Sequence, residues 1–127
     1  MWDVNKKLKI AVYDEIQNDS ETAARLISGY YEEKARPAEV LLFNKAEEFV
    51  GAFRKNSFAT VFIGINGMRD VDTAWVVRER DKKCPIVIMS RCGDYSLEGY
   101  RLEASDYLLK PLDEQKLCKT LGRLKMI

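Results

Sequence analysis

Histidine is absent from this chain, and several other hallmarks of binding and catalytic proteins are missing with it. Without histidine there is no His-based triad or general base, and most transition-metal sites are excluded. The three cysteines, Cys84, Cys92 and Cys118, lack CxxC spacing, which indicates reduced thiols rather than a disulfide framework or zinc site. No apolar run approaches the roughly 20 residues that span a bilayer, and the start has no secretory h-region. We therefore expect a soluble, cytoplasmic protein.

A charge excess of either sign is also missing, since 21 basic residues nearly balance 20 acidic ones. The net charge of +1 gives no electrostatic argument for a membrane surface, or for nucleic acid binding by this chain alone. The content of 46% hydrophobic and 32% charged residues is ordinary for a globular protein. A chain of 127 residues forms one core, so we expect a single domain over 1–127, with 1–7 as an N-terminal tail.

A short apolar run just before the midpoint, within Ala59–Met68, is the clearest strand signal. Its residues Val61–Ile65 are mostly β-branched or aromatic, and the turn-prone pair Asn66-Gly67 follows them. Such a run, without polar alternation, is typical of a strand buried on both faces in a parallel sheet covered by helices. Gly64 near its end either relieves crowding or leaves an empty place where a side chain could stand.

Strand patterns alternate with helical patterns along the whole chain. We expect the other strands over Leu8–Tyr13, Val40–Phe43, Pro85–Met89 and Tyr107–Leu109. We expect helices behind Asn18 with Glu21, behind Asn44 with Glu47, over about Asp70–Arg80, over about Tyr95–Leu102 and from near Asp113. This alternation predicts an α/β fold, a doubly wound parallel sheet of five strands with five helices and right-handed crossovers.

The residues that end the strands are the candidate functional residues. In a doubly wound sheet, ligands bind outside the carboxyl ends of the strands. These ends carry the acidic pair Asp14-Glu15, Gly64, Ser90 with Arg91, and Lys110. Although they are far apart in sequence, we expect them to lie along one edge of the sheet.

A family resemblance extends over about Leu8–Leu121. Three segments carry it: Ile10–Glu15, Pro85–Ser90 and, most specifically, Ala104–Pro111, which contains Asp-Tyr-Leu-Leu-Lys-Pro. In these segments the chain resembles the CheY-like receiver domains of bacterial response regulators, most of all those attached to LytTR-type DNA-binding domains. The resemblance implies a flavodoxin-like, three-layer α/β/α sandwich with strand order 2-1-3-4-5 and a role in two-component signal transduction.

The resemblance also implies roles for single residues. It implies a cis bond between Lys110 and Pro111. By the same resemblance, Asp14 and Glu15 are the metal-binding acidic pair, and Ser90 is the switch Ser/Thr. Tyr107 is the switch aromatic, and Lys110 is the lysine of the phosphorylation site. From the residues alone, Ser90 could equally cap the next segment and Tyr107 could be a half-buried packing residue.

The chain departs from the family at the phosphoacceptor. The family pattern Phe-Leu-Asp-Ile falls on Phe62–Ile65, so Gly64 stands where the aspartate is expected. No Asp or Glu occurs between Phe58 and Arg69 to replace it. Arg91 is a second departure, because the family usually keeps a small residue there. Since aspartyl-phosphate chemistry needs a carboxylate nucleophile, we expect a non-enzymatic pseudo-receiver without a catalytic residue.

The two departures change the expected charge balance of the site. Asp14 and Glu15, with Asn66 nearby, should bind magnesium weakly or not at all, and no other cofactor is expected. We expect Lys110 to lie against the acidic pair and Arg91 to reach into or over the space left by Gly64. The site would then balance its charge without a metal.

The expected function is protein–protein contact. By the resemblance, a protein partner or a second copy would bind the fourth helix, fifth strand and fifth helix, where the chain offers Leu97, Tyr100, Arg101, Lys116 and Lys119. Two alternatives stay open: a sensor of a small molecule or anion in the vacated pocket, and the receiver part of a larger DNA-binding transcriptional regulator. A Rossmann enzyme and a P-loop NTPase are disfavoured because neither glycine-rich motif is present.

Overall fold

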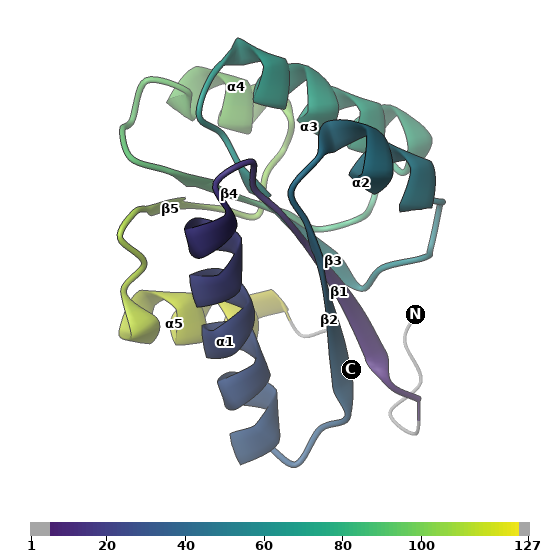
Figure 1. Cartoon of the computed structure of the whole chain (residues 1–127), viewed down its shortest axis with the longest axis vertical. Helices are drawn as coiled ribbons and strands as arrows, with labels where there is room; N and C mark the ends of the chain where they lie inside the picture. The colour runs from purple at the N-terminus through teal and green to yellow at the C-terminus, as the bar shows by residue number, and fades with distance from the viewer. Residues whose placement is uncertain (1–5, 125–127) are drawn as a thin grey trace.

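A computed structural model describes residues 6–124 as a five-stranded parallel sheet between two layers of helices (Figure 1). The strands are β1 (Leu8–Tyr13), β2 (Ala38–Phe43), β3 (Thr60–Gly64), β4 (Ile86–Ser90) and β5 (Asp106–Leu109). The helices are α1 (Gln17–Glu33), α2 (Ala46–Ala52), α3 (Met68–Arg80), α4 (Ser96–Arg101) and α5 (Glu114–Leu124). Most of the predicted N-terminal tail lies outside the described residues.

The strand order is β2-β1-β3-β4-β5, and every neighbouring pair is parallel. This confirms the predicted doubly wound fold. All residues of β3 and β4 are buried, which explains why their sequences lack polar alternation. The edge strands β2 and β5 are partly exposed instead.

Two apolar clusters hold the helices on the sheet. α1 and α5 cover one face, and α2, α3 and α4 cover the other (Figure 1). On the second face the ring of Tyr13 stacks on Phe49, with ring centroids 5.4 Å apart and planes at 3°. None of the helices within residues 6–124 has the length and apolarity needed to cross a membrane.

Two of the predicted helix starts are wrong. α1 begins at Gln17 without a side-chain cap, so Asn18 and Glu21 do not form a capping box. α2 begins at Ala46, also without a side-chain cap. The amide of Asn44 instead donates to the carbonyl oxygen of Asp14 at 2.8 Å and to Ser20 Oγ at 2.9 Å. Asn44 therefore ties the end of β2 to the connection between β1 and α1, where the candidate site lies.

Candidate functional site

The carboxyl ends of the strands bring the predicted residues to one edge of the sheet. Asp14 follows β1, Gly64 ends β3 and Lys110 follows β5. Asp14 is fully buried and Lys110 is 8% exposed. The ammonium nitrogen Nζ of Lys110 lies 2.7 Å from Asp14 Oδ2. The expected contact between Lys110 and the acidic pair is present, and Asp14 makes it.

The space left by Gly64 is filled by the carboxylate of Asp14. A Cβ built at Gly64 would lie 2.0 Å from Asp14 Oδ2 and 2.3 Å from its Cγ, far inside van der Waals contact. Asp14 Oδ1 accepts hydrogen bonds from the backbone N–H of Ile16 and the side-chain amide of Asn66, both at 3.0 Å. This conformation of Asp14 therefore depends on glycine at position 64.

Arg91 does not reach the space beside Gly64, so that prediction is wrong. Its guanidinium donates to Asp19 instead, from Nη1 to Oδ2 at 2.8 Å and from Nη2 to Oδ1 at 3.2 Å. Lys110 Nζ also donates to Asp19 Oδ2, at 2.8 Å. Although partial burial opposes it, these hydrogen bonds from Arg91 and Lys110 lower the pKa of Asp19. Asp14, Lys110, Asp19 and Arg91 thus alternate in charge and balance one another without a metal.

Asp19 is the member of this network that the sequence analysis missed. It lies in the first turn of α1, on the helix that leaves the edge of the sheet after Asp14. Its partners are 72 and 91 residues away in sequence. Its position in the sequence could have indicated its role, because an acidic residue is favourable at a helix N-terminus and the helix α1 begins at the carboxyl edge of the sheet.

Glu15 forms no ion pair with Lys110 among the described residues and belongs instead to a second acidic group. The hydroxyl of Tyr13 donates to Asp70 Oδ1 at 3.2 Å and to Glu15 Oε1 at 3.4 Å. The backbone N–H of Asn66 donates to Asp70 Oδ2 at 2.8 Å. Burial raises the pKa of Asp70 to about 6, opposed by the Asn66 hydrogen bond and reinforced by Glu15. The predicted acidic pair is therefore divided between two clusters.

Magnesium would have to compete with bonds that the predicted ligands already make. Asp14 Oδ1 accepts two hydrogen bonds, and Asp14 Oδ2 is ion-paired with Lys110 Nζ but accepts no hydrogen bond within residues 6–124. Asn66 Oδ1 accepts from Lys110 Nζ at 3.2 Å. Within residues 6–124, no three acidic or cysteine side chains lie together in a group that could hold a metal ion. In this arrangement Asp14, Glu15 and Asn66 do not fit a divalent cation, and weak binding stays a prediction.

The substitution Asp70→Asn should make the domain more stable near pH 8 by about 1–2 kcal/mol and flatten its pH dependence. Because folding raises the pKa of Asp70, the folded state binds the extra proton, and stability falls as pH rises from about 4 to about 6. The amide keeps an acceptor for the Asn66 N–H. Urea unfolding at about pH 4, 6 and 8 measures the effect. Asp72→Asn, an exposed change on the same helix, is the control, and an unchanged pH slope in Asp70→Asn would contradict the assignment.

The side chains of Ser90 and Tyr107 contact the loop between β4 and α4, while the backbone N–H of Lys110 donates to Ser90 O at 2.7 Å. Ser90 Oγ accepts from the backbone N–H of Cys92 at 3.5 Å, and the hydroxyl of Tyr107 donates to the carbonyl of Cys92 at 2.6 Å. The half-buried ring of Tyr107 packs beside Gly99 of α4. The Lys110-Pro111 bond is cis, as the resemblance implies. A switch between rotamers at Tyr107 stays a prediction.

The sequence is similar to regulators of bacterial signalling, although no protein-family model matches it. It is 27% identical over 110 residues to "Sensory transduction protein LytT" of Bacillus anthracis, covering 84% of this chain and 45% of LytT. It is 32% identical over 83 residues to "Transcriptional regulatory protein BtsR" of Escherichia coli K12, covering 65% of this chain and 35% of BtsR. The chain therefore spans less than half the length of these curated relatives.

Solved structures share the fold at lower identity. A signal receiver domain from Clostridium thermocellum has a TM-score of 0.79 at 14% identity, over 96% of this chain and 100% of that one. The response regulatory domain of mrkE from Klebsiella pneumoniae has a TM-score of 0.77 at 22% identity, over 92% and 94%. The structures establish the fold, and the sequence relatives connect it with response regulators. This chain is a receiver domain of the response regulators of two-component systems, similar to LytT and BtsR.

Proposed function

We propose that this receiver domain signals without phosphorylation, as a pseudo-receiver that acts by binding another protein. The observation that carries the proposal is the Asp14 carboxylate, which stands 2.0 Å from the Cβ position of Gly64. It is fully buried and paired with Lys110 at 2.7 Å. An aspartyl phosphate needs a carboxylate that can reach the phosphoryl donor. Gly64 has none, and Asp14 is enclosed by its partners.

Incubation with acetyl phosphate and magnesium should leave the wild-type protein unlabelled. The reason is the missing carboxylate at Gly64 together with the burial of Asp14. Intact-mass measurement before and after hydroxylamine treatment detects an acyl phosphate. A receiver domain that retains its acceptor aspartate is the positive control, and its labelling shows that the phosphoryl donor is active. Stoichiometric, hydroxylamine-sensitive labelling of the wild type would refute the proposal. Its loss in Asp14→Asn would then identify Asp14 as the acceptor.

The proposed contact surface is the face formed by α4, β5 and α5. Leu97 and Tyr100 of α4 are 54% and 82% exposed, and Leu109 of β5, which the sequence analysis did not include, is 55% exposed. The predicted cations of this face are also exposed: Arg101 of α4 with Lys116 and Lys119 of α5. Exposed apolar side chains beside cations suit a partner surface with an apolar centre and acidic rim.

Charge reversal on this face should weaken association with a partner or a second copy. Arg101→Glu combined with Lys119→Glu should raise the dissociation constant by about tenfold or more, because rim charges would then repel the partner. Sedimentation velocity measures self-association, and pull-down captures another protein. Arg25→Glu with Lys45→Glu, two exposed positions elsewhere, is the matched control. A strict monomer that captures no partner would contradict this mode of action.

A hollow of about 220 Å³ beside the site favours a second candidate, a sensor of small anions. It is lined by Asn18, Asp19, Thr22, Met89, Arg91, Lys110, Pro111 and Leu112. A ligand there would have to compete with Asp19 for both cations. The pseudo-receiver remains the better-supported proposal because the site already satisfies its own charges.

The relatives support a wider setting for the same proposal. BtsR is named a transcriptional regulatory protein, and this chain covers 35% of its length. We infer that the pseudo-receiver works as the receiver part of a larger DNA-binding regulator. The contacts of α4, β5 and α5 would then bring regulator subunits or a signalling partner together.

A further inference from the structure

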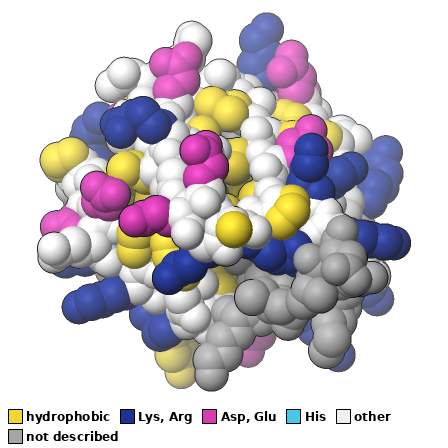
Figure 2. All heavy atoms as spheres, turned by 90° about the horizontal axis from the view of Figure 1, so that it is seen from below, with side chains coloured by type: hydrophobic (Ala, Val, Ile, Leu, Met, Phe, Trp, Pro, Cys, Tyr) yellow, Lys and Arg dark blue, Asp and Glu magenta, His cyan; other side chains and the backbone are white. Residues whose placement is uncertain are grey.

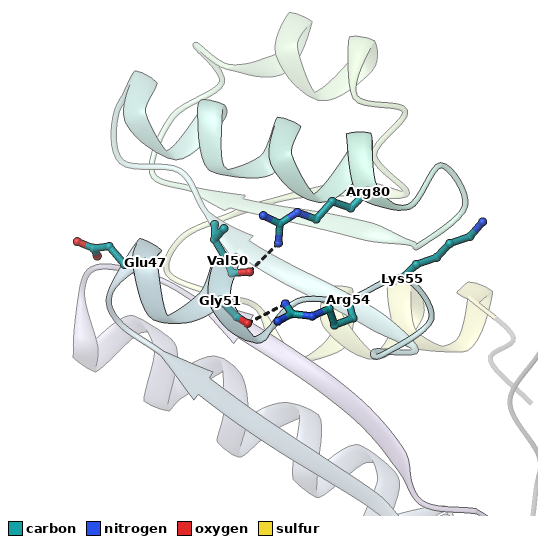
Figure 3. Close-up of a pocket in the computed structure, with 6 residues that line it drawn as sticks. All are labelled: Glu47, Val50, Gly51, Arg54, Lys55 and Arg80. Carbon is teal, nitrogen blue, oxygen red and sulfur yellow. Dashed lines mark hydrogen bonds between the residues drawn. The ribbon is translucent and has the colours of Figure 1, made fainter.

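A hollow of about 800 Å³ lies where α2 and α3 end (Figure 3). It is lined by Glu47, Val50, Gly51, Arg54, Lys55 and Arg80. α2 ends before β3 begins, so the hollow belongs to the amino end of β3. Gly64 and Lys110 lie at the carboxyl ends of their strands. The hollow is therefore separate from the candidate site and from the proposed function.

Two arginines in the hollow are held in place by the C-terminal carbonyls of α2. Arg54 Nη1 donates to Gly51 O at 2.8 Å and Phe53 O at 2.9 Å. Arg80 Nη1 donates to Val50 O at 2.7 Å and Phe53 O at 3.3 Å, and Figure 3 shows both side chains directed at the helix end. These bonds cover carbonyls that would repel an anion. Within residues 6–124 the Nε and Nη2 groups of both arginines have no hydrogen-bond partner, so they are available to a ligand.

The cations of this hollow are only partly balanced by acids: Glu47 also lines it, and, although burial opposes the shift, the charge of Lys55 helps to lower the pKa of Asp81. Within the described residues, Arg54, Lys55 and Arg80 form no ion pair. Glu47 points away from the two arginines in Figure 3. Asp81 is turned inward, where its carboxylate accepts from the backbone N–H groups of residues 56, 83 and 84. By contrast, Figure 2 shows Lys and Arg interspersed with Asp and Glu over the lower side of the molecule.

We propose that this hollow binds a compact oligophosphate through Arg54, Lys55 and Arg80. Its size falls within the range of about 300–1,000 Å³ that small-molecule sites occupy. Guanidinium groups bind phosphate oxygens in pairs of parallel hydrogen bonds, and here the two forks are already oriented by the helix end. Three cationic residues require several anionic groups, which linked phosphates supply in a small volume. Exposed Lys82 and Lys83 on the adjoining loop add attraction over a longer range.

Calorimetric titration of the full chain with inorganic tripolyphosphate, in metal-free buffer at low salt, tests the proposal. Arg80→Gln and Lys55→Gln should each weaken binding by about tenfold. Lys55 donates no hydrogen bond within residues 6–124, so its variant reports on binding even if loss of the Arg80 bonds perturbs folding. Arg25→Gln, an exposed change on α1, should bind as wild type does.

The source of the phosphates is distinguished by parallel titrations. Equal affinities for tripolyphosphate and ATP would support recognition of the phosphate chain alone, and tighter binding of ATP would support a nucleotide. Citrate that binds as tightly as tripolyphosphate would overturn the assignment to phosphates. Absence of binding at about 1 mM ligand, or equal losses in Arg25→Gln and Arg80→Gln, would overturn the site itself. Binding lost in Arg91→Gln but kept in Arg80→Gln would place the ligand at the carboxyl edge and also overturn it.

Discussion

Arg78→Ala should destabilise the domain by about 3–5 kcal/mol, a large part of the stability of a domain of this size. Arg78 lies inside α3 and is 6% exposed. Its Nε donates to Leu102 O at 2.8 Å, and its Nη1 donates to Asp81 O at 3.0 Å and Cys84 O at 2.8 Å. One guanidinium thus joins the ends of α3 and α4 to the start of β4. Its removal would leave buried carbonyls without donors.

Urea unfolding of Arg78→Ala, Arg78→Lys and wild type measures this effect. Lysine keeps the charge but has one ammonium instead of a planar fork, so Arg78→Lys should recover less than half of the loss. Arg25→Ala, an exposed change on α1, is the control and should remain within about 0.5 kcal/mol of wild type. A loss below about 1 kcal/mol for Arg78→Ala would show that water replaces the guanidinium at little cost.

The fold was predictable because its signals are local. The apolar run in β3 and the proline that precedes β4 both mark buried strands, and the structure places them at the centre of the sheet. The spacing of the sequence is consistent with the burial of Arg78, since Arg78 stands seven residues after Val71, on the inner face of the same helix. From sequence alone, a charged side chain such as that of Arg78 is expected to be exposed to solvent. Its burial becomes predictable only when its carbonyl partners on other elements are known. Two of those partners, Leu102 and Glu103, are 24 and 25 residues away in sequence.

The candidate site was predictable in its members and not in its contacts. The ends of parallel strands must share an edge, which brings Asp14, Gly64 and Lys110 together. The direction of each side chain is set by competition among neighbours that the sequence does not rank. Asp14 turns inward because Gly64 leaves room and Lys110 is near, whereas its neighbour Glu15 turns toward Tyr13. The sequence predicts that Arg91 reaches position 64, but Arg91 pairs with Asp19 instead and does not obstruct that position.

Gly64→Ala should cost about 2–4 kcal/mol, although it adds a single methyl group to a strand. The new Cβ would meet Asp14 Oδ2 at 2.0 Å, so the carboxylate would have to turn outward. Asp14 would then lose Lys110 and Asn66, and Lys110 would remain buried with Asp19 as its acidic partner. Urea unfolding measures the loss. Gly29→Ala is the matched control, because nothing lies within 4 Å of its Cβ position and alanine favours a helix.

A double-mutant cycle with Asp14→Ala separates this clash from a general effect of alanine in the strand. Once the carboxylate is removed, a methyl group at position 64 has room. The double variant should therefore be at least as stable as Asp14→Ala alone, with a coupling energy of about 2 kcal/mol between the two sites. The same steric conflict faces Gly64→Asp, so a restored acceptor would first have to displace Asp14. If Gly64→Ala lowers the free energy of unfolding equally in the wild-type and Asp14→Ala backgrounds, the Asp14 carboxylate does not occupy the space beside Gly64.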